Sequence, residues 1–244
     1  MDRYLKYIKR GWANISFRKY TDVQLKEPII SFTFDDAPAS AFENGGGILS
    51  KYGFGGTFYI AVSLMQDAGT QFTAAQLEEA IYHRHELGCH TFNHIDLSKT
   101  NLKQSIFDIE HNQAAINAII SDVSFKNFSY PFGAQTRGIK QYLSNRFRTA
   151  RGIAHGINAG RTDLCNLKAV KLYENKLSLD QIFQSIQSAM DHNAWLIFYT
   201  HDVSNNPSKY GCSPGYFETV VKECAAGGFK VATIDEAMDL IERN

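Results

Sequence analysis

The sequence has few cysteines, no long apolar run and no excess of charge of either sign. Four cysteines in 244 residues, with no CxxC pair among them, are too few and too scattered for a disulfide framework. No segment approaches the ~20 consecutive apolar residues that span a membrane. Twenty-five basic and twenty-five acidic side chains cancel, which gives no electrostatic reason to expect a nucleic-acid partner. With 44% hydrophobic residues, the composition is that of a globular protein with a sizeable core.

The N-terminal residues are basic and amphipathic. Charges recur every few positions in residues 1–20, with no apolar signal-peptide core, so the expected location is the cytoplasm. Apolar side chains fall at helical spacing between the basic ones, at Tyr4, Leu5, Ile8, Trp12 and Ile15. Such a helix either makes a weak contact with a membrane surface or packs its apolar stripe on the domain, and the second interpretation is favoured. We therefore separate residues 1–27 from a domain that covers 28–244.

The rest of the chain alternates between short apolar runs and longer amphipathic segments. The apolar runs predict strands at 29–34, 56–61, 127–132, 195–200 and 229–234. Apolar residues at three- and four-residue spacing predict helices at 74–88, 104–120, 179–192 and 216–228, and Thr233 with Glu236 forms a capping-box pattern before a last helix. This alternation is typical of a parallel sheet covered by helices.

About seven strand–helix units favour one α/β domain, a distorted (β/α) barrel with about seven parallel strands. An open, doubly wound sheet is the alternative, but no GxGxxG pattern follows the first strand.

Two pairs of polar residues follow predicted strands or turns. The first strand ends in Asp35 and Asp36, and two adjacent carboxylates repel each other unless a cation offsets their charge. The ordinary alternative is a turn acid beside a helix cap. His90 and His94 are four residues apart, which on a helical turn would let two imidazoles share one metal ion; the alternative is simple packing.

Two later strands also end in residues that suit a catalytic site. The run 195–200 is followed by His201, which is placed to act as a general acid or base. The strand 127–132 is stopped by Pro131, and the tight backbone after it could aim an N–H group at a developing oxyanion. Because the carboxyl ends of parallel strands form the working face of such folds, we expect these groups to lie together.

Four segments carry a resemblance to a known family. TFDDAP (33–38) resembles a TFDDGP motif, and HTFNH (90–94) is similar to H-[ST]-x-x-H. YPFG (130–133) is similar to an R-x-P-[FY] region and FYTH (198–201) to L-x-x-H. In this order they resemble the motifs of the polysaccharide deacetylases, the NodB-homology or carbohydrate esterase family 4 enzymes. The resemblance runs from about Pro28 to the C-terminus.

The resemblance implies a metal site and a reaction. Its metal ligands would be Asp36, His90 and His94, and the ion is usually zinc, with cobalt, nickel or manganese as alternatives. Asp35 would be the general base and His201 the general acid. The backbone N–H of Phe132 would stabilise the oxyanion.

Some positions depart from the family pattern or are hard to assign. Ser129 stands where the family has the arginine that orients the catalytic aspartate. The replacement charge is expected from Arg151, Arg161 or Lys168, and Lys168 is our choice. We choose Asp163 as the acid that tunes the catalytic histidine, and Phe198 as a wall of the acetyl pocket.

These observations predict an enzyme that removes N-acetyl, or also O-acetyl, groups from an acetylated sugar or polysaccharide. One alternative is a hydrolase of a non-sugar or cyclic amide on the same barrel. Another is a non-catalytic, metal-containing module that binds glycans, which the missing arginine at Ser129 suggests.

Overall fold

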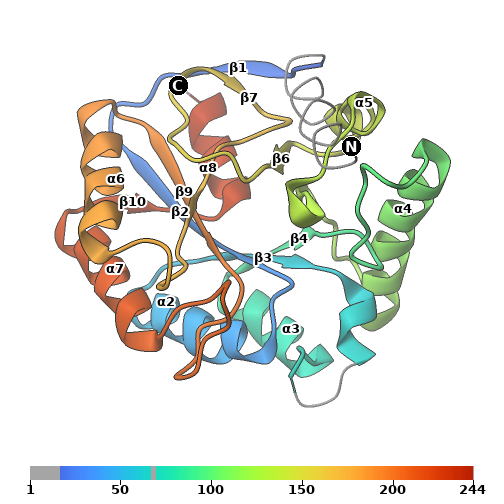
Figure 1. Cartoon of the computed structure of the whole chain (residues 1–244), viewed down its shortest axis with the longest axis horizontal. Coiled ribbons are helices and arrows are strands. Elements are labelled where there is room, and N and C mark those ends of the chain that lie inside the picture. Colours follow the sequence, from blue (N-terminus) through green and yellow to red (C-terminus); the bar gives the residue numbers. More distant parts are fainter. Residues whose placement is uncertain (1–16, 67–69, 244) are drawn as a thin grey trace, which may run out of the picture.

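The centre of the computed structural model, which describes residues 17–66 and 70–243, is a curled parallel sheet (Figure 1). Seven strands follow one another in the order β6-β5-β4-β3-β2-β9-β8, and β10 pairs with the first residues of β2. Their bounds are β2 (Ile29–Asp35), β3 (Thr57–Ile60), β4 (Glu86–Cys89), β5 (Asn127–Ser129), β6 (Thr149–Arg151), β8 (Val170–Lys171), β9 (Trp195–Thr200) and β10 (Lys230–Val231). The prediction of a distorted (β/α) barrel with about seven parallel strands is confirmed.

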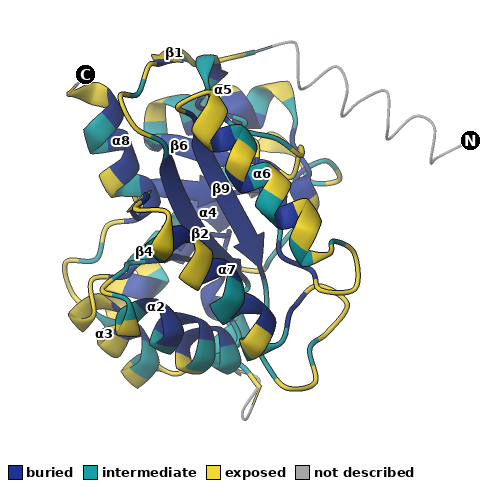
Figure 2. Cartoon of the chain, turned by 90° about the vertical axis from the view of Figure 1, so that its left-hand side faces the viewer, coloured by how far each residue is buried: buried dark blue, intermediate teal, exposed yellow. Residues whose placement is uncertain are grey.

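Helices surround this sheet and expose their outer faces. The α-helices are α2 (Gly47–Lys51), α3 (Ala74–Tyr82), α4 (Leu102–Ile119), α5 (Arg137–Arg146), α6 (Leu179–Asp191), α7 (Pro214–Ala226) and α8 (Ile234–Glu242). Shorter helical segments are η1 (Ala41–Gly46), η2 (Val62–Gln66) and η3 (Pro131–Gly133). Figure 2 shows the buried strands β2 and β9 at the centre and exposed residues on the outward sides of α6 and α7.

The two faces of the sheet are both buried, in two separate hydrophobic clusters. Side chains alternate along each strand, so Phe32 and Phe198 pack in the larger cluster, which includes residues of the surrounding helices. Tyr59 and Tyr199 face the other way, into the smaller cluster inside the curl of the sheet. Asp35, the last residue of β2, therefore faces the inside of the curl at the carboxyl end of the strands.

Three strands of the central sheet, β4, β6 and β8, were absent from the prediction. The helix predicted at 74–88 ends at Tyr82, and Arg84, with a φ of 62°, turns the chain into β4. Strands β6 and β8 contain only three and two residues, too few for a periodic pattern to show. The capping box of Thr233 and Glu236 is present at the start of α8.

The N-terminal part of the described chain forms a second, two-stranded sheet. Strand β1 (Tyr20–Val23) pairs antiparallel with β7 (Gly160–Asp163). The predicted basic amphipathic helix lies in residues that the structure does not describe, so its membrane contact and the boundary between residues 27 and 28 stay predictions.

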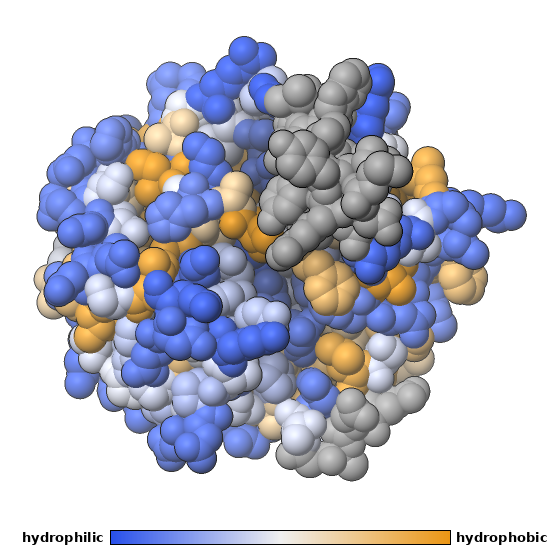
Figure 3. All heavy atoms as spheres, in the orientation of Figure 1, coloured by the Kyte–Doolittle hydropathy of each residue, from blue (hydrophilic) through white to orange (hydrophobic). Residues whose placement is uncertain are grey.

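The surface in the view of Figure 3 is mainly hydrophilic, with hydrophobic residues in separate small groups. Among the described residues, no helix combines the length and the apolar character needed to cross a bilayer.

Candidate metal centre and active site

Three side chains from two loops converge at the carboxyl end of the sheet. One potential ligand atom from each of Asp36, His90 and His94 lies within 4.8 Å of the other two. The Oδ1 atom of Asp36 is 3.5 Å from Nε2 of His90 and 3.1 Å from Nε2 of His94. Asp36 follows β2 and the histidines follow β4, which pairs with β3 beside β2. The structure therefore brings together the three residues predicted as metal ligands.

The local turns differ from the helical turn that the spacing suggested. His94 and Thr91 have φ values of 50° and 61°, so the His90–His94 segment is a tight turn with left-handed residues. Asp36 also has a positive φ of 58°, which turns its carboxylate away from the direction of β2.

The protonation of these groups suits a divalent cation. Burial lowers the pKa of His90 to about 3 and also lowers the pKa of His94, although the charge of Asp35 opposes both shifts. Both imidazoles are therefore neutral at pH 7 and can offer a lone pair. Burial raises the pKa of Asp36 to about 6, with a further contribution from Asp35 and an opposing one from His201. The buried Oδ1 of Asp36 has no hydrogen-bond donor among the described residues, so two neutral nitrogens and an unpartnered carboxylate oxygen fit a metal ion.

A backbone carbonyl orients one of the histidines. Nδ1 of His90 lies 2.8 Å from the carbonyl oxygen of Ser129, which requires a proton on Nδ1. Nε2 then carries the lone pair and faces Asp36. Metal-ligating histidines are commonly fixed in this way by a hydrogen bond from their second nitrogen.

The other acid of the pair has a different partner. The guanidinium of Arg151, the last residue of β6, donates to Oδ1 of Asp35. It also donates to the hydroxyl of Ser129, which donates to the same Asp35 oxygen at 3.1 Å. Ser129 and Arg151 are direct register partners in β5 and β6. The positive charge expected at the position of Ser129 therefore comes from the adjacent strand.

This finding corrects the choice of Lys168. Lys168 is exposed, and its backbone carbonyl and N–H groups form hydrogen bonds with the side-chain amide of Asn158. Arg161, the third residue considered, lies over the ring of Tyr20. Arg151 was among the residues considered, but sequence spacing gave no reason to prefer it.

Arg151 is fully buried and its position is fixed by aromatic rings. Its guanidinium carbon lies 5.3 Å from the ring centre of Tyr59 and 4.8 Å from that of Tyr199. Burial raises the pKa of Asp35, but the charge of Arg151, with smaller effects of His90 and His201, outweighs it and holds that pKa well below its usual range. Asp35 is therefore ionised throughout the neutral range.

The remaining predicted catalytic residue lies on the opposite side of Asp36. Nε2 of His201 is 3.9 Å from Oδ2 of Asp36, and its Nδ1 is 3.4 Å from the hydroxyl of Tyr173. The ring of Tyr210 lies 5.3 Å from the His201 ring. These two tyrosines were not predicted from the sequence, because neither belongs to a motif and both are well separated from His201 along the chain.

The choice of Asp163 as the acid beside His201 is also corrected. Asp163 lies in β7 and pairs with the buried Lys140 of α5 at 2.7 Å. It further accepts the backbone N–H groups of Lys19 and Cys165. These contacts give Asp163 a structural role, and the polar neighbour of His201 Nδ1 is Tyr173.

The residues predicted for the substrate pocket divide into two groups. Pro131 begins η3, and Phe132 follows with a φ of 57° and a half-exposed side chain whose ring centre lies 4.5 Å from that of His94, in an edge-to-face arrangement. Phe132 therefore lies at the rim of the candidate metal centre, while the role of its N–H group stays a prediction. Phe198 is fully buried and stacks on Phe32 in the core next to α7, on the sheet face opposite to Asp35, which corrects its assignment to the acetyl pocket.

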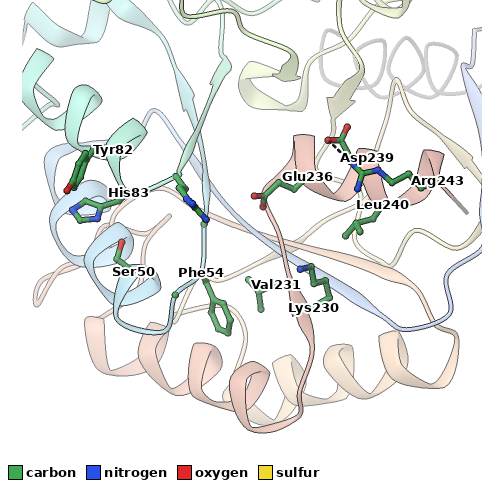
Figure 4. Close-up of a pocket in the computed structure, with 13 residues that line it drawn as sticks. Ser50, Phe54, Tyr82, His83, Lys230, Val231, Glu236, Asp239, Leu240 and Arg243 are labelled. Atoms are coloured by element: carbon green, nitrogen blue, oxygen red, sulfur yellow. Dashed lines mark ion pairs between the residues drawn. The ribbon is translucent and has the colours of Figure 1, made fainter.

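A cavity of about 610 Å³ lies at the other end of the strands and includes no residue of this centre (Figure 4). Lys230, which contributes to its wall, pairs with Ile29 at the start of β2, whereas Asp35 ends that strand. Its acids have other partners, because Glu236 caps α8 and Asp239 forms ion pairs with Arg148 and Arg243. Neither the position of this cavity nor the partners of its acids indicates a catalytic site there.

Comparison with known proteins agrees with the site. A polysaccharide deacetylase family model matches residues 22–146, slightly more than half of the chain. A bifunctional xylanase/deacetylase from Pseudobutyrivibrio xylanivorans is 24% identical over 216 residues, which cover 88% of this chain and 31% of that protein. The chain thus spans about a third of the length of this curated relative.

Solved structures with the same fold include an enzyme and a pseudoenzyme. A family 4 acetyl xylan esterase from Clostridium thermocellum, in complex with a cobalt ion, has a TM-score of 0.63 at 18% identity and matches over 87% of this chain and 91% of its own. A family 4 pseudoenzyme from Bacillus anthracis has a TM-score of 0.64 at 13% identity, over 89% and 67% of the two chains. At these identities the likeness shows the fold alone. The family model covers the segments with Asp35, Asp36, His90 and His94, and this chain therefore belongs to the polysaccharide deacetylases, the NodB-homology or carbohydrate esterase family 4 proteins.

Proposed function

We propose that this chain is a metal-dependent hydrolase that removes acetyl groups from a carbohydrate. One observation carries the proposal: Asp36, His90 and His94 form a compact ligand set, and the ionised carboxylate of Asp35 and the imidazole of His201 lie beside it. A metal ligand set, a base and an acid in one place are the parts that hydrolysis of an amide or ester needs.

The chemistry of the donors suggests the ion. Two neutral imidazoles and one carboxylate are a ligand set that zinc accepts, and cobalt, nickel or manganese bind similar donors. Three protein ligands leave coordination positions for water and for an acetyl oxygen. When bound, the ion would polarise the acetyl carbonyl and make water a better nucleophile at neutral pH.

Asp35 is the proposed general base. Its carboxylate is held ionised and in place by Arg151 and Ser129, so it can take a proton from the attacking water. The water oxygen forms a bond to the acetyl carbon as the proton moves to Asp35.

His201 is the proposed general acid. The bond between the acetyl carbon and the sugar nitrogen or oxygen then breaks, and the leaving group needs a proton. Nε2 of His201 supplies it, while Tyr173 accepts a hydrogen bond from Nδ1 and keeps the ring in place. Acetate and the deacetylated sugar are the products.

The substrate is proposed to be an acetylated sugar or polysaccharide. Phe132 and Tyr210 are both exposed beside the centre, and apolar ring faces of this kind suit the C–H faces of a sugar. The names of the relatives direct attention to O-acetylated xylan, and N-acetylated oligosaccharides are the other class to compare.

The binding-module alternative loses its main motivation in this structure. It rested on the missing arginine at Ser129, and Arg151 supplies that charge. The same fold in a pseudoenzyme from Bacillus anthracis shows that the assay must test turnover as well as binding.

The test is acetate release from O-acetyl xylan, N-acetyl oligosaccharides and a cyclic amide, with and without a chelator. We expect release from one of the sugars that stops with the chelator and returns with added zinc or cobalt. His94→Ala should lose this activity, while the matched variant His83→Ala, which alters an exposed histidine outside the centre, should keep it. Turnover of the cyclic amide alone, or activity insensitive to the chelator, would contradict the proposal.

A further inference from the structure

The turn that carries the histidines has an unfavourable backbone. Thr91 (φ 61°) and His94 (φ 50°) both lie in the left-handed region, which a β-branched residue such as Thr91 rarely adopts. Such conformations persist only where surrounding contacts impose them. The contacts that impose this one are therefore relevant to the position of His94.

Asp108, in the second turn of α4, supplies the densest set of these contacts. One of its carboxylate oxygens accepts the backbone N–H groups of Phe92 and Asn93, at 2.8 and 3.1 Å. The other accepts the side-chain amide of Asn93 at 2.6 Å. Asp108 is 6% exposed, so these three hydrogen bonds to a charged acceptor are shielded from water.

Other contacts fix the same turn from the remaining sides. The carbonyl of Phe92 accepts the hydroxyl of Ser63 at 2.6 Å, and the ring of His111 stacks on the Phe92 ring at 4.0 Å. The hydroxyl of Thr91 accepts the N–H of Ile95 at 3.2 Å. Among these, Asp108 is the charged group, and it holds the two residues between Thr91 and His94.

We propose that Asp108 is a positioning residue that holds the His90–His94 turn in its metal-binding conformation. The inference rests on the proposed metal site. Asp108 does not touch the ligand atoms; it acts through the backbone of residues 92 and 93. Without it, the left-handed residues relax, and Nε2 of His94 leaves the position 3.1 Å from Asp36.

The test is the affinity for Zn²⁺ and Co²⁺, measured by competition with a chromophoric chelator. In Asp108→Asn, one oxygen still accepts the two backbone N–H groups but no longer carries the charge that strengthens these bonds, and the contact with Asn93 survives only if the Asn93 amide turns over. Groups that orient metal ligands typically contribute ~10–100-fold to metal affinity, and we expect a loss in that range. Asp96→Asn is the matched control, because Asp96 accepts the backbone N–H of Ser98 in the loop after the histidine turn. The affinity of this variant for the metal should stay within about threefold of the wild-type value.

An exchange separates this role from general stability. Asn93→Asp combined with Asp108→Asn reverses donor and acceptor in the 2.6 Å contact and keeps the two backbone contacts. The double variant should recover most of the affinity lost in Asp108→Asn, and the thermal midpoints of the metal-free proteins should not explain the difference. Unchanged affinity in Asp108→Asn would overturn the role of Asp108 alone. Absence of saturable metal binding by the wild type would overturn both this role and the proposed function.

Discussion

Replacing Arg151 by methionine should change the pH dependence of activity. The substitution removes the charge beside Asp35 but keeps much of the apolar length between Tyr59 and Tyr199. Asp35 is 5% exposed, and after the substitution it keeps the hydrogen bond that the Ser129 hydroxyl donates to it. A buried carboxylate that loses its ionic partner is destabilised, so the pKa of Asp35 must rise.

The size of the effect follows from the buried pair. Breaking a buried ion pair by removal of one partner costs about 3–5 kcal/mol, and 1.36 kcal/mol corresponds to one pKa unit, so the pKa of Asp35 should rise by ~2–4 units. In the wild type the pKa of Asp35 is depressed on folding, so its contribution to stability is present above its unfolded value near 3.8 and is lost as the pH falls below it. In the variant this contribution disappears, and the protonated form accumulates at higher pH.

The assay is the pH profile of kcat/KM between pH 3 and 8, because the acid limb set by Asp35 lies near or below the lower end of this range in the wild type. We expect the acid limb to move upward in Arg151→Met, with a further loss of about 100-fold at neutral pH because Asp35 is no longer oriented. Arg151→Lys should keep the positive charge but lose the hydrogen bond to Ser129. The acid limb of its pH profile should therefore lie between those of the wild type and Arg151→Met.

A double variant that exchanges the residues at positions 129 and 151 controls for damage to the fold. Ser129 and Arg151 are direct neighbours in β5 and β6, so Ser129→Arg with Arg151→Ser keeps the composition and the charge beside Asp35. It should restore the wild-type acid limb. If Arg151→Met has the wild-type limb, or if the exchange is no better than Arg151→Ser, the reasoning about Arg151 is wrong.

Three further outcomes can be measured on simpler samples. Asp35→Asn should keep the metal by elemental analysis and lose ~10²–10⁴-fold in rate, whereas Asp36→Asn should lose metal affinity first; equal metal loss in both would reverse our assignment. Burial lowers the pKa of His85 to about 4, and its Nδ1 accepts the N–H of Gly56 at 3.0 Å. The unfolded chain therefore binds more protons at this position below pH 6.5, and His85 alone should lower the free energy of unfolding by about 2 kcal/mol between pH 7 and 5 in urea titrations, so the total fall should be smaller in His85→Asn. Dialysis against a chelator should lower the thermal midpoint of the wild type and leave that of His94→Ala unchanged.

The fold was predictable because its signals are local and repeated. Strand–helix alternation and the capping pattern of Thr233 and Glu236 depend on neighbours in the chain, and both are present in the structure. The triple glycine 45–47 has no such local explanation. In the structure η1 is a π-helix, and a side chain at Gly45 would lie 2.6 Å from the Phe34 ring, so Gly45 permits a close approach of helix and strand, whereas a side chain at Gly47 would meet nothing within 4 Å.

The site was predictable only where motifs carried it. The ligand set and the two catalytic candidates were named from three short segments, and the structure places them together. Arg151 could not be selected, because its contact with Asp35 depends on the register of β5 and β6, and β6 has only three residues. Tyr173 and Asp108 were also missed, because each contacts the site from an element that is distant in the sequence.

The adjacent pair of acids shows how one turn separates two functions. Asp35 remains in the strand and points toward Arg151 inside the sheet, while Asp36 (φ 58°) and Ala37 (φ 45°) take left-handed conformations. This turn directs the Asp36 carboxylate to His90 and His94, away from the guanidinium. Two neighbouring carboxylates therefore have separate partners, a guanidinium for Asp35 and the proposed metal ion for Asp36, and such an ion would offset the repulsion that an isolated pair suffers. The left-handed φ of Ala37 also explains why glycine is usual at that position of the motif, since glycine adopts this conformation without steric cost.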